Sequence, residues 1–395
     1  MDHQKKFLQL LRSSDETNVT LALTMAKGMP ELNLDEILQD YLELYQCLVS
    51  KRLKKQVKAK HILVLNQTKI KASRIGLTYL PESIGDFPNL QELDLSHNQI
   101  TQLPQNFWNL PALQDLNLIG NQLTKLPEDI GRLKTLRKLR LNLNSLSSLP
   151  QSLGNLPALE HLQLGTNVLN ELSNNLDNLT TLKELYLVGN QLITLPQCLG
   201  NLPQLQVLHL NNNQLTHLPQ NFGNLQHLKT LQLYQNSLTA LPKSIGDLQH
   251  LHTLYLENNQ LTQLPQEIGN LHQLHVLHLN NNRLTQLPTS IGNLSHLQML
   301  SLPNNQVTAL PESLCNLAHL RDLHLANNQL TQLPENIGNL QNLQMLRLQG
   351  NNFTALPESL KHLQNLRNLY LKGNPIASST IEKIKQQLPN CKINI

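Results

Sequence analysis

The sequence predicts an α/β solenoid, in which short parallel strands form one concave sheet and compact segments cover the opposite, convex side. Three observations lead to this fold class. The chain of 395 residues comes into register with itself at a period of 23 residues, without gap or insertion, over residues 90–365. Leucines alternate with other side chains in the first part of each period, as in a half-buried strand. Aromatic residues make up only 3% of the chain, so leucine must fill most of the core.

Each period has the pattern LxxLxLxxNxLTxLPxxIGNLxx, of which residues 251–273 are an example. Leu254 and Leu256 are expected to point into the core from a strand that pairs in parallel with its neighbours. An asparagine, here Asn259, recurs at the same place in all thirteen periods that start from residue 90 onward. Because a buried asparagine at a turn can satisfy unpaired backbone groups, these side chains are expected to form a ladder. The Leu-Pro segment suits an extended or short 3-10 conformation, since proline fixes φ and lacks an N–H donor.

The repeats divide the chain into three parts. Residues 1–66 are expected to be an N-terminal helical cap or a docking segment, and the sequence leaves both roles open. Residues 67–377 are the solenoid, with a degenerate first repeat at 67–89, full repeats at 90–365 and a partial last repeat. Residues 378–395 are expected to form a C-terminal capping helix.

Two helices are expected in the N-terminal part. The first begins at Ser13 or Ser14 and closes near Gly28, and a longer one, capped by Asn33, runs over residues 34–58 with apolar side chains at helical spacing. The run Ile62–Leu65 is an alternative first strand, so the start of the solenoid stays open between this run and the degenerate repeat.

Repeat 159–181 departs from the pattern, because Leu172-Ser173 replaces Leu-Pro and Asp177 replaces the glycine. Neutral drift explains these changes, and the alternative is a local change of curvature that shapes the binding face.

The outward positions of the predicted strands are not needed for the core, so the residues found there are informative about function. The position after the second leucine of each repeat is rich in Tyr, His and Arg, and neighbouring positions add Tyr and Met. Such side chains are enriched where proteins meet. We therefore expect a protein partner on the concave face, bound by Arg140, Tyr186, His209, Tyr234, Tyr255, His278, Met299, His324, Arg347 and Tyr370.

No catalytic residue, metal site or cofactor is expected. The chain has no glycine-rich phosphate loop, no GxSxG or HExxH motif, and no cysteine beside a plausible base. The sixteen histidines are scattered; His209 and His278 share a column but lie three repeats apart, about 14 Å at the usual strand spacing. The four cysteines form no CxxC pair and outline no disulfide framework. The sequence therefore predicts a protein that is not an enzyme.

A basic stretch in residues 51–74 is the second feature of the sequence that bears on function. It contains no acidic residue and nine basic ones: Lys51, Arg52, Lys54, Lys55, Lys58, Lys60, Lys69, Lys71 and Arg74. A basic run at the end of a helix ordinarily complements the helix dipole in solvent. The alternative is a surface that binds nucleic acid or an anionic membrane. The formal net charge of +4 is small for a nucleic-acid binder, so we favour a protein partner.

The repeat motif over residues 67–388 resembles the leucine-rich-repeat superfamily. Its 23-residue Leu-Pro form is similar to repeats of bacterial proteins, of Ras-group intracellular scaffolds, of type IV secreted effectors and of Roco GTPases. The resemblance implies a leucine-rich-repeat horseshoe and protein–protein recognition, with a bacterial secreted effector as one role. The chain departs from two of these groups, since neither a GTP-binding domain nor a C-terminal ubiquitin-ligase domain accompanies the repeats.

The expected location is the cytoplasm. The apolar patch Phe7–Leu11 is too short for a signal peptide, and no stretch approaches the roughly 18 apolar residues of a membrane span. Cysteines without a disulfide pattern suit a reducing compartment. The alternative is secretion into a host cell without a cleavable signal peptide.

Overall fold

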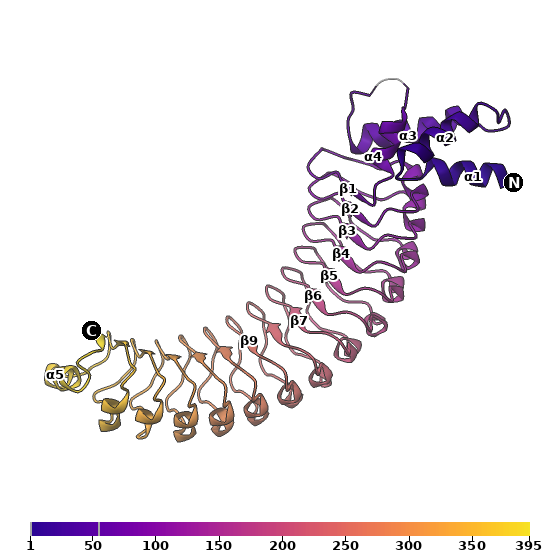
Figure 1. Ribbon diagram of the computed structural model, residues 1–395. Helices are drawn as coiled ribbons and strands as arrows, with labels where there is room; N and C mark the ends of the chain where they lie inside the picture. The colour runs from indigo at the N-terminus through magenta and orange to yellow at the C-terminus, as the bar shows by residue number, and fades with distance from the viewer. Residues whose placement is uncertain (1, 54–55) are drawn as a thin grey trace. The chain divides into compact units, whose positions relative to one another are not determined.

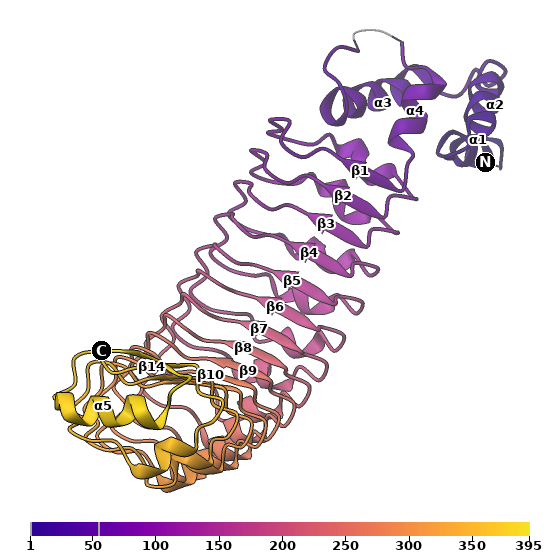
Figure 2. The same ribbon diagram turned by 60° about the vertical axis from the view of Figure 1, so that its left-hand side comes forward.

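The computed structural model describes residues 2–53 and 56–395. The chain separates into two compact units: unit 1 is Met1–Leu169 with Asn178–Leu182, and unit 2 is Asn170–Asp177 with Lys183–Ile395. The division falls within the irregular repeat 159–181. In each unit the short strands follow one another in chain order, with compact turns of 3-10 helix on the opposite side (Figures 1 and 2).

Unit 1 begins with helices, whose described members are α1 (Asp2–Leu11), α2 (Glu16–Ala26), α3 (Leu34–Leu48) and α4 (Ala59–Leu65). Asp15 caps α2, because its side chain accepts a hydrogen bond from the backbone N–H of Asn18. Asn33 caps α3 in the same way through the N–H of Glu36. Buried apolar side chains then pack these helices into a small core of their own: Phe7, Leu11, Val19, Ala22, Leu44, Leu48, Ile62 and Leu65.

The helix predicted to close near Gly28 is confirmed as α2, although its cap is Asp15. The longer predicted helix over residues 34–58 is wrong at its C-terminal end, because α3 stops at Leu48. The Gln46 side chain instead donates a hydrogen bond to the Leu53 carbonyl, at 2.6 Å, from the chain that follows the helix. The alternative first strand at Ile62–Leu65 is also wrong, because these residues are the end of α4. The sequence analysis did not predict α1.

The degenerate repeat 67–89 supplies the first strand of unit 1. The strands are β1 (Lys69–Lys71), β2 (Glu92–Asp94), β3 (Asp115–Asn117), β4 (Lys138–Arg140) and β5 (His161–Gln163). They pair in parallel in this order, and paired residues lie one period of 23 apart, as Ile70 with Leu93 shows. Ile70 and Ala72 are buried where regular repeats have leucines, so the degenerate repeat still contributes to the core.

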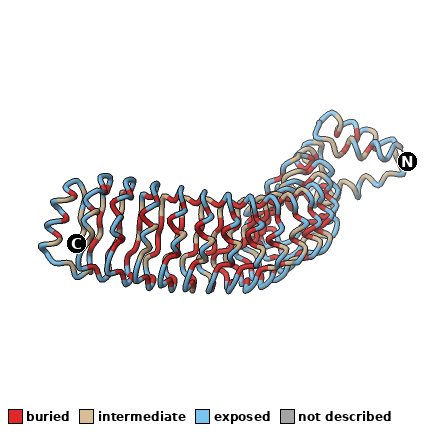
Figure 3. Tube along the Cα trace, turned by 90° about the horizontal axis from the view of Figure 1, so that it is seen from below, coloured by how far each residue is buried: buried red, intermediate tan, exposed pale blue. Residues whose placement is uncertain are grey.

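Unit 2 continues the same pattern with β6 (Glu184–Tyr186), β7 (Val207–His209), β8 (Thr230–Gln232), β9 (Thr253–Tyr255), β10 (Val276–His278), β11 (Met299–Ser301), β12 (Asp322–His324), β13 (Met345–Arg347) and β14 (Asn368–Tyr370). Neighbouring strands are parallel, and Leu254 of β9 pairs with Leu277 of β10. The central leucine of each strand is buried while its two neighbours are at least partly exposed, except at Ser301. Figure 3 shows this alternation of buried and exposed positions along the repeats.

The Leu-Pro segments form the predicted 3-10 turns. In a typical repeat Pro265 is extended (φ −67°, ψ 150°) and the turn follows at Gln266–Asn270, with Ile268 and Gly269 buried. In unit 1 the turns are Glu82–Asp86, Gln105–Asn109, Glu128–Arg132 and Gln151–Asn155. Leu176–Asn178 lies at the division between the units. In unit 2 they are Gln197–Asn201, Phe222–Asn224, Lys243–Asp247, Gln266–Asn270, Thr289–Asn293, Glu312–Asn316, Ile337–Asn339 and Glu358–His362.

The predicted asparagine ladder is confirmed, and Asn282 shows how it works. Its Nδ2 donates to the carbonyls of Leu256 and Leu279, at 2.9 and 3.0 Å, and its Oδ1 accepts the N–H of Leu261 at 3.0 Å. Only 7% of the residue is exposed. Because Leu256 and Leu261 lie in the preceding repeat, the asparagine joins one repeat to the next.

The C-terminal cap is a helix followed by a strand. Helix α5 (Ser378–Gln387) begins where the sequence predicts, and its Ile381 and Ile384 are buried. The expectation of a helix over the whole of 378–395 is wrong, because β15 (Lys392–Asn394) pairs in parallel with β14. This last strand gives the backbone groups of β14 their partners on that side.

Candidate protein-binding site

The predicted site residues lie at outward positions of the strands or, for Tyr234, two residues after one. We call this surface of unit 2 the strand face; it is formed by the outward residues of β6 to β14 and the second residue after each strand. Nine of the ten predicted residues belong to it: Tyr186, His209, Tyr234, Tyr255, His278, Met299, His324, Arg347 and Tyr370. Arg140 lies in β4 of unit 1, where its Nη1 is 2.6 Å from Asp115 Oδ1 in an ion pair.

Tyr186 and His209 are packed against each other on neighbouring strands. Their rings meet edge to face with centroids 4.8 Å apart. The Tyr186 hydroxyl donates a hydrogen bond of 2.9 Å to Glu184 Oε2. Burial, together with this carboxylate, raises the pKa of Tyr186 to about 12. Burial lowers the pKa of His209, so both side chains present neutral, amphipathic rings near neutral pH.

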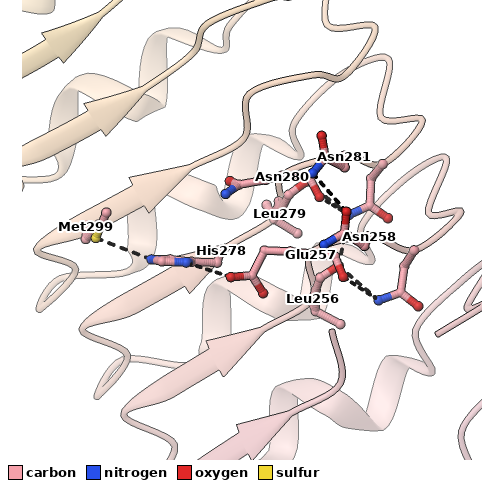
Figure 4. A network of polar contacts seen from close by, with 10 residues as sticks. Leu256, Glu257, Asn258, His278, Leu279, Asn280, Asn281 and Met299 are labelled. Carbon is pink, nitrogen blue, oxygen red and sulfur yellow. Dashed lines mark hydrogen bonds and ion pairs between the residues drawn. The ribbon is translucent and has the colours of Figure 1, made fainter. Parts of the chain in front are cut away.

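Four side chains form a contiguous group around β9, β10 and β11, and Figure 4 shows three of them. His278 Nδ1 lies 2.7 Å from Glu257 Oε1, and His278 Nε2 lies 3.3 Å from the sulfur of Met299. The Tyr255 ring meets the His278 ring edge to face at 5.1 Å. Glu257 and His278 are largely enclosed, with 16% and 20% of their side chains exposed. We call Tyr255, Glu257, His278 and Met299 the central group.

A second group lies on the last strands of the repeat. The guanidinium of Arg347 stacks 5.1 Å above the Tyr370 ring, a cation–π contact, and its Nε donates to the sulfur of Met345 at 3.2 Å. His324, on the preceding strand, has a buried Nε2 without a hydrogen-bond partner among the described residues. Burial and the charge of Arg347 lower the pKa of His324.

Two positions differ from the simple picture of an exposed column. Ser301 lies in the predicted column, yet it is only 2% exposed, because it is a small residue between larger neighbours on β10 and β12. Tyr234 is partly exposed two residues beyond β8, and among the described residues no ring contact joins it to the central group. The structure thus brings Tyr255, His278 and Met299 together and leaves Tyr234 apart.

Glu257 belongs to the central group but was not among the ten predicted site residues. It lies two positions beyond the end of β9, 21 residues before His278, and Met299 lies 21 residues after His278. This spacing is the period of 23 less two, so it joins diagonal neighbours on adjacent strands. The same diagonal joins the Asn142 and Gln163 side chains at 3.3 Å in unit 1, so the spacing is a signal that the sequence carries.

Several other histidines of unit 2 contact one another outside the strand face. His227 stacks on His250 with centroids 6.1 Å apart, and His296 stacks on His319 at 6.0 Å. His275 contacts His252 and His296. Over the part of the chain that the structure describes, no three His, Cys, Asp or Glu side chains are arranged to hold a metal ion. The four cysteines are free thiols.

The basic stretch 51–74 is only partly described, because Lys54 and Lys55 lie outside the described residues. Lys51, Arg52, Lys58, Lys60, Lys71 and Arg74 are exposed. Lys69 forms an ion pair of 2.8 Å with Glu92. No described helix is long and apolar enough to cross a membrane.

Acidification is expected to destabilise unit 2 through His209 and His324. The pKa of each is lowered below the usual 6.5 in the folded chain, so the unfolded chain binds more protons as the pH falls below about 6.5. The stability is therefore complete above pH 6.5 and declines as the pH falls toward the folded pKa values. Urea unfolding between pH 8 and pH 5 measures this decline.

The variant His324→Gln is expected to lose less stability over the same range, because glutamine does not titrate. At pH 8, His209 and His324 are both neutral, so the difference in free energy of unfolding between the variant and the original chain reports packing alone. An equal pH dependence in the two proteins would show that His324 does not contribute.

Comparison with families of known proteins gives extensive matches. The model of a family described as "Leucine-rich repeat region" matches residues 105–218, 194–278, 266–318 and 304–388. A second model, "Leucine rich repeat", matches residues 79–123. No curated protein matches the chain.

Several solved structures are similar to this chain over most of its length. A leucine-rich-repeat protein of Leptospira interrogans is 37% identical, with a TM-score of 0.78 over 92% of this chain and 98% of that one. The internalin InlF of Listeria monocytogenes is 28% identical, with a TM-score of 0.69 over 86% of this chain and 95% of that one. A chain of the PEPR1–AtPEP1 structure is 31% identical, with a TM-score of 0.69 over 76% of this chain and 44% of that one. The regular strands, the asparagine ladder and these matches show that the chain belongs to the leucine-rich-repeat family.

Proposed function

We propose that this chain is a non-catalytic scaffold that binds a protein partner through the strand face of unit 2. Leucine-rich-repeat proteins are typically protein–protein interaction scaffolds, and one similar structure is the complex of PEPR1 with AtPEP1. The observation that carries the proposal is the run of Tyr, His, Met and Arg side chains at the outward positions of consecutive strands. These residue types are the ones enriched at the centres of protein interfaces.

The contacts within the strand face also support binding. Tyr255 rests against His278, and Arg347 rests on Tyr370, so these large side chains are already held in place by their neighbours. Immobilising a free side chain on binding costs about 0.5–1.5 kcal/mol, and a side chain that is already packed avoids much of that cost. A partner therefore meets a surface that is arranged in advance.

The test is a triple variant, Tyr234→Ala, Tyr255→Ala and His278→Ala, compared with the original chain in affinity capture from cell lysate with identification by mass spectrometry. Proteins captured specifically by the original chain are expected to fall at least tenfold with the variant, as expected when several central contacts are lost together. All three residues point away from the leucine core, so the far-UV circular dichroism should stay unchanged.

The matched control replaces three exposed histidines outside the strand face by alanine, His227, His250 and His319. This control is expected to capture the same proteins as the original chain. Capture that survives the strand-face variant, or that is lost with the control, would place the binding surface elsewhere.

For the cellular location, we propose the cytoplasm, with delivery into a host cell as a bacterial effector as the alternative. The four free cysteines support a reducing compartment, and Cys47 and Cys315 are buried thiols. Burial raises the pKa of both thiols to about 11, which keeps them protonated and unreactive. Fractionation of cells that produce the protein distinguishes the two locations.

A further inference from the structure

The end of α3 and the loop that follows β1 expose three large apolar side chains in unit 1. Val49, directly after α3, is 43% exposed, and Ile75 and Tyr79 in the loop are 42% and 64% exposed. Of the large apolar side chains that the structure describes, Tyr79 is the most exposed. A single exposed apolar residue is ordinary, whereas several on one surface indicate that something binds there.

Two observations place these side chains on one surface. The Cys47 sulfur lies 3.5 Å from the carbonyl oxygen of Tyr79, so the chain just before Val49 runs beside the loop. Cys47, Lys51 and Tyr79 also line one cleft of about 340 Å³. Figures 1 and 2 show α3 next to the first repeat. The two segments that carry the exposed apolar residues are therefore neighbours in space.

Positive side chains stand among the apolar ones. Lys51 and Arg52 follow Val49, and Arg74 precedes Ile75; all three basic residues are exposed, and among the described residues no carboxylate forms an ion pair with them. Glu43 is the one carboxylate that lines the cleft. We call this part of unit 1 the basic-apolar surface, formed by Val49, Lys51, Arg52, Arg74, Ile75 and Tyr79.

Two further lysines stand on the helix beside α3. Lys58 and Lys60 are exposed at the start of α4. This helix contacts α3 through His61, whose ring centroid lies 4.9 Å from that of Tyr45. Burial, and then the charges of Lys60 and Lys58, lower the pKa of His61. These lysines add to the positive charge beside the basic-apolar surface.

We propose that the basic-apolar surface docks on the surface of an anionic phospholipid bilayer. Lys51, Arg52 and Arg74 would lie among the negative headgroups, which attract basic residues near a membrane. Val49 and Ile75 would enter the boundary between headgroups and acyl chains, where exposed aliphatic side chains leave water. Tyr79 suits the same depth, since tyrosine is enriched at membrane–water interfaces.

Two simpler explanations account for only part of this surface. Lys51 and Arg52 complement the dipole at the end of α3, but Arg74 comes from another segment, and a helix dipole requires no exposed apolar residue. Nucleic acid would attract the same positive charges through its phosphates. The phosphate backbone gives exposed Val49 and Ile75 nothing apolar to contact, so the combination favours a bilayer.

The test is flotation of the purified full chain with lipid vesicles. The probes are vesicles of phosphatidylcholine containing about 30% phosphatidylserine, and vesicles of phosphatidylcholine alone. The chain is expected to float with the anionic vesicles, to stay behind with the neutral ones, and to bind less tightly as salt is added. Equal binding to both kinds of vesicle, or binding to neither, would overturn the proposal.

A charge variant tests the basic residues: Lys51→Gln, Arg52→Gln and Arg74→Gln. Each basic residue near an anionic membrane contributes about fivefold in affinity, so the three changes together are expected to weaken vesicle binding about a hundredfold. The matched control removes three exposed lysines elsewhere, Lys125→Gln, Lys138→Gln and Lys361→Gln, and so changes the net charge equally. Equal losses in the two proteins would mean that only overall charge attracts the chain, which would contradict a docking surface.

An apolar variant distinguishes a bilayer from nucleic acid: Val49→Ser, Ile75→Ser and Tyr79→Ser. It is expected to bind anionic vesicles at least tenfold more weakly, with unchanged far-UV circular dichroism because all three side chains are exposed. The matched control is Leu143→Ser, Val168→Ser and Ile193→Ser, which are exposed apolar residues of other repeats. Vesicle binding that survives the apolar variant, or tighter binding of the original chain to a single-stranded oligonucleotide than to vesicles, would overturn the proposal. The basic-apolar surface shares no residue with the strand face, so either outcome leaves the proposed protein-binding function untouched.

Discussion

Replacing Asn282 by alanine is expected to lower the free energy of unfolding by about 3–5 kcal/mol. The change removes the side chain that accepts from the N–H of Leu261 and donates to the carbonyls of Leu256 and Leu279. An unpaired buried backbone group costs about 1–3 kcal/mol, and this substitution leaves several of them together. The partners belong to two repeats, so the loss weakens the junction between them as well as the turn itself.

Urea unfolding followed by far-UV circular dichroism measures the effect of Asn282→Ala. The matched control is Asn293→Ala, which changes the same residue type at an exposed position at the end of a 3-10 turn. The control is expected to stay within about 0.5 kcal/mol of the original chain, as is usual for exposed positions. Equal effects of the two substitutions would mean that water satisfies the backbone groups that Asn282 now serves.

Replacing Gly292 by alanine is expected to destabilise unit 2 by about 2–3 kcal/mol. The added Cβ would overlap the backbone carbonyl oxygen of Ser313 in the next turn and would lie 2.9 Å from the Ser313 Cβ. Inserting a methyl group into a close-packed region typically costs about 1–3 kcal/mol, and backbone cannot move aside as a flexible side chain does. The glycine is therefore needed for the close approach of successive 3-10 turns.

The control for Gly292→Ala is Gly28→Ala, where the nearest atom to the added Cβ is the Met25 carbonyl oxygen at an ordinary 3.6 Å. There the substitution is expected to be neutral or to stabilise slightly, because it restricts the unfolded chain. The urea midpoints of both variants, compared with that of the original chain, measure these effects on stability. A Gly292→Ala variant as stable as the original chain would show that neighbouring turns can move apart without loss.

The repeated part of the fold was predictable because each position has one physical task that recurs every 23 residues. Leu254, Asn259 and Ile268 are buried where the pattern places them, and the equivalents of Leu254 and Ile268 are buried in the other full repeats as well. The degenerate repeat was harder, since Ile62–Leu65 is a short apolar run and such runs suit a strand or a helix equally well. The flanking Lys58–His61 segment starts a helical turn there, which settles the run as part of α4.

Element ends were less predictable than element types. Apolar residues continue at helical spacing beyond Leu48 to Leu53, yet α3 ends at Leu48. Periodicity alone contains no stop signal, so the sequence pattern did not indicate this end. The last strand was missed for another reason. β15 pairs with β14 at an offset of 24 residues, as Lys392 with Asn368 shows, so it stands outside the repeat on which the predictions were based.

In the site, the sequence indicated which residues lie on the strand face but not which of them touch. Some contacts join residues directly across adjacent strands, as between Tyr255 and His278, whereas others run diagonally, as between Glu257 and His278. Placement on the strand face and contact between its side chains have different physical origins. Burial of the leucines follows from the backbone alternation, whereas the exposure and the contacts of an outward residue also depend on the sizes of its neighbours, as the small, enclosed Ser301 shows.

Because the strands share one register, the strand face can become longer or shorter by whole repeats without a change in how the core packs. β8, β9 and β10 present Leu231, Leu254 and Leu277 to the interior at equal offsets, so excising residues 251–273 would set β8 beside β10 with the same pairing. Side chains on either side of the excision would approach by about one strand spacing, 4.8 Å. Duplication or deletion of a 69-nucleotide coding unit (3 × 23) therefore alters the distance between recognition groups while the leucine packing and the asparagine bridges are rebuilt unchanged. Gain or loss of whole repeats can therefore adapt such a molecule to a longer or shorter partner.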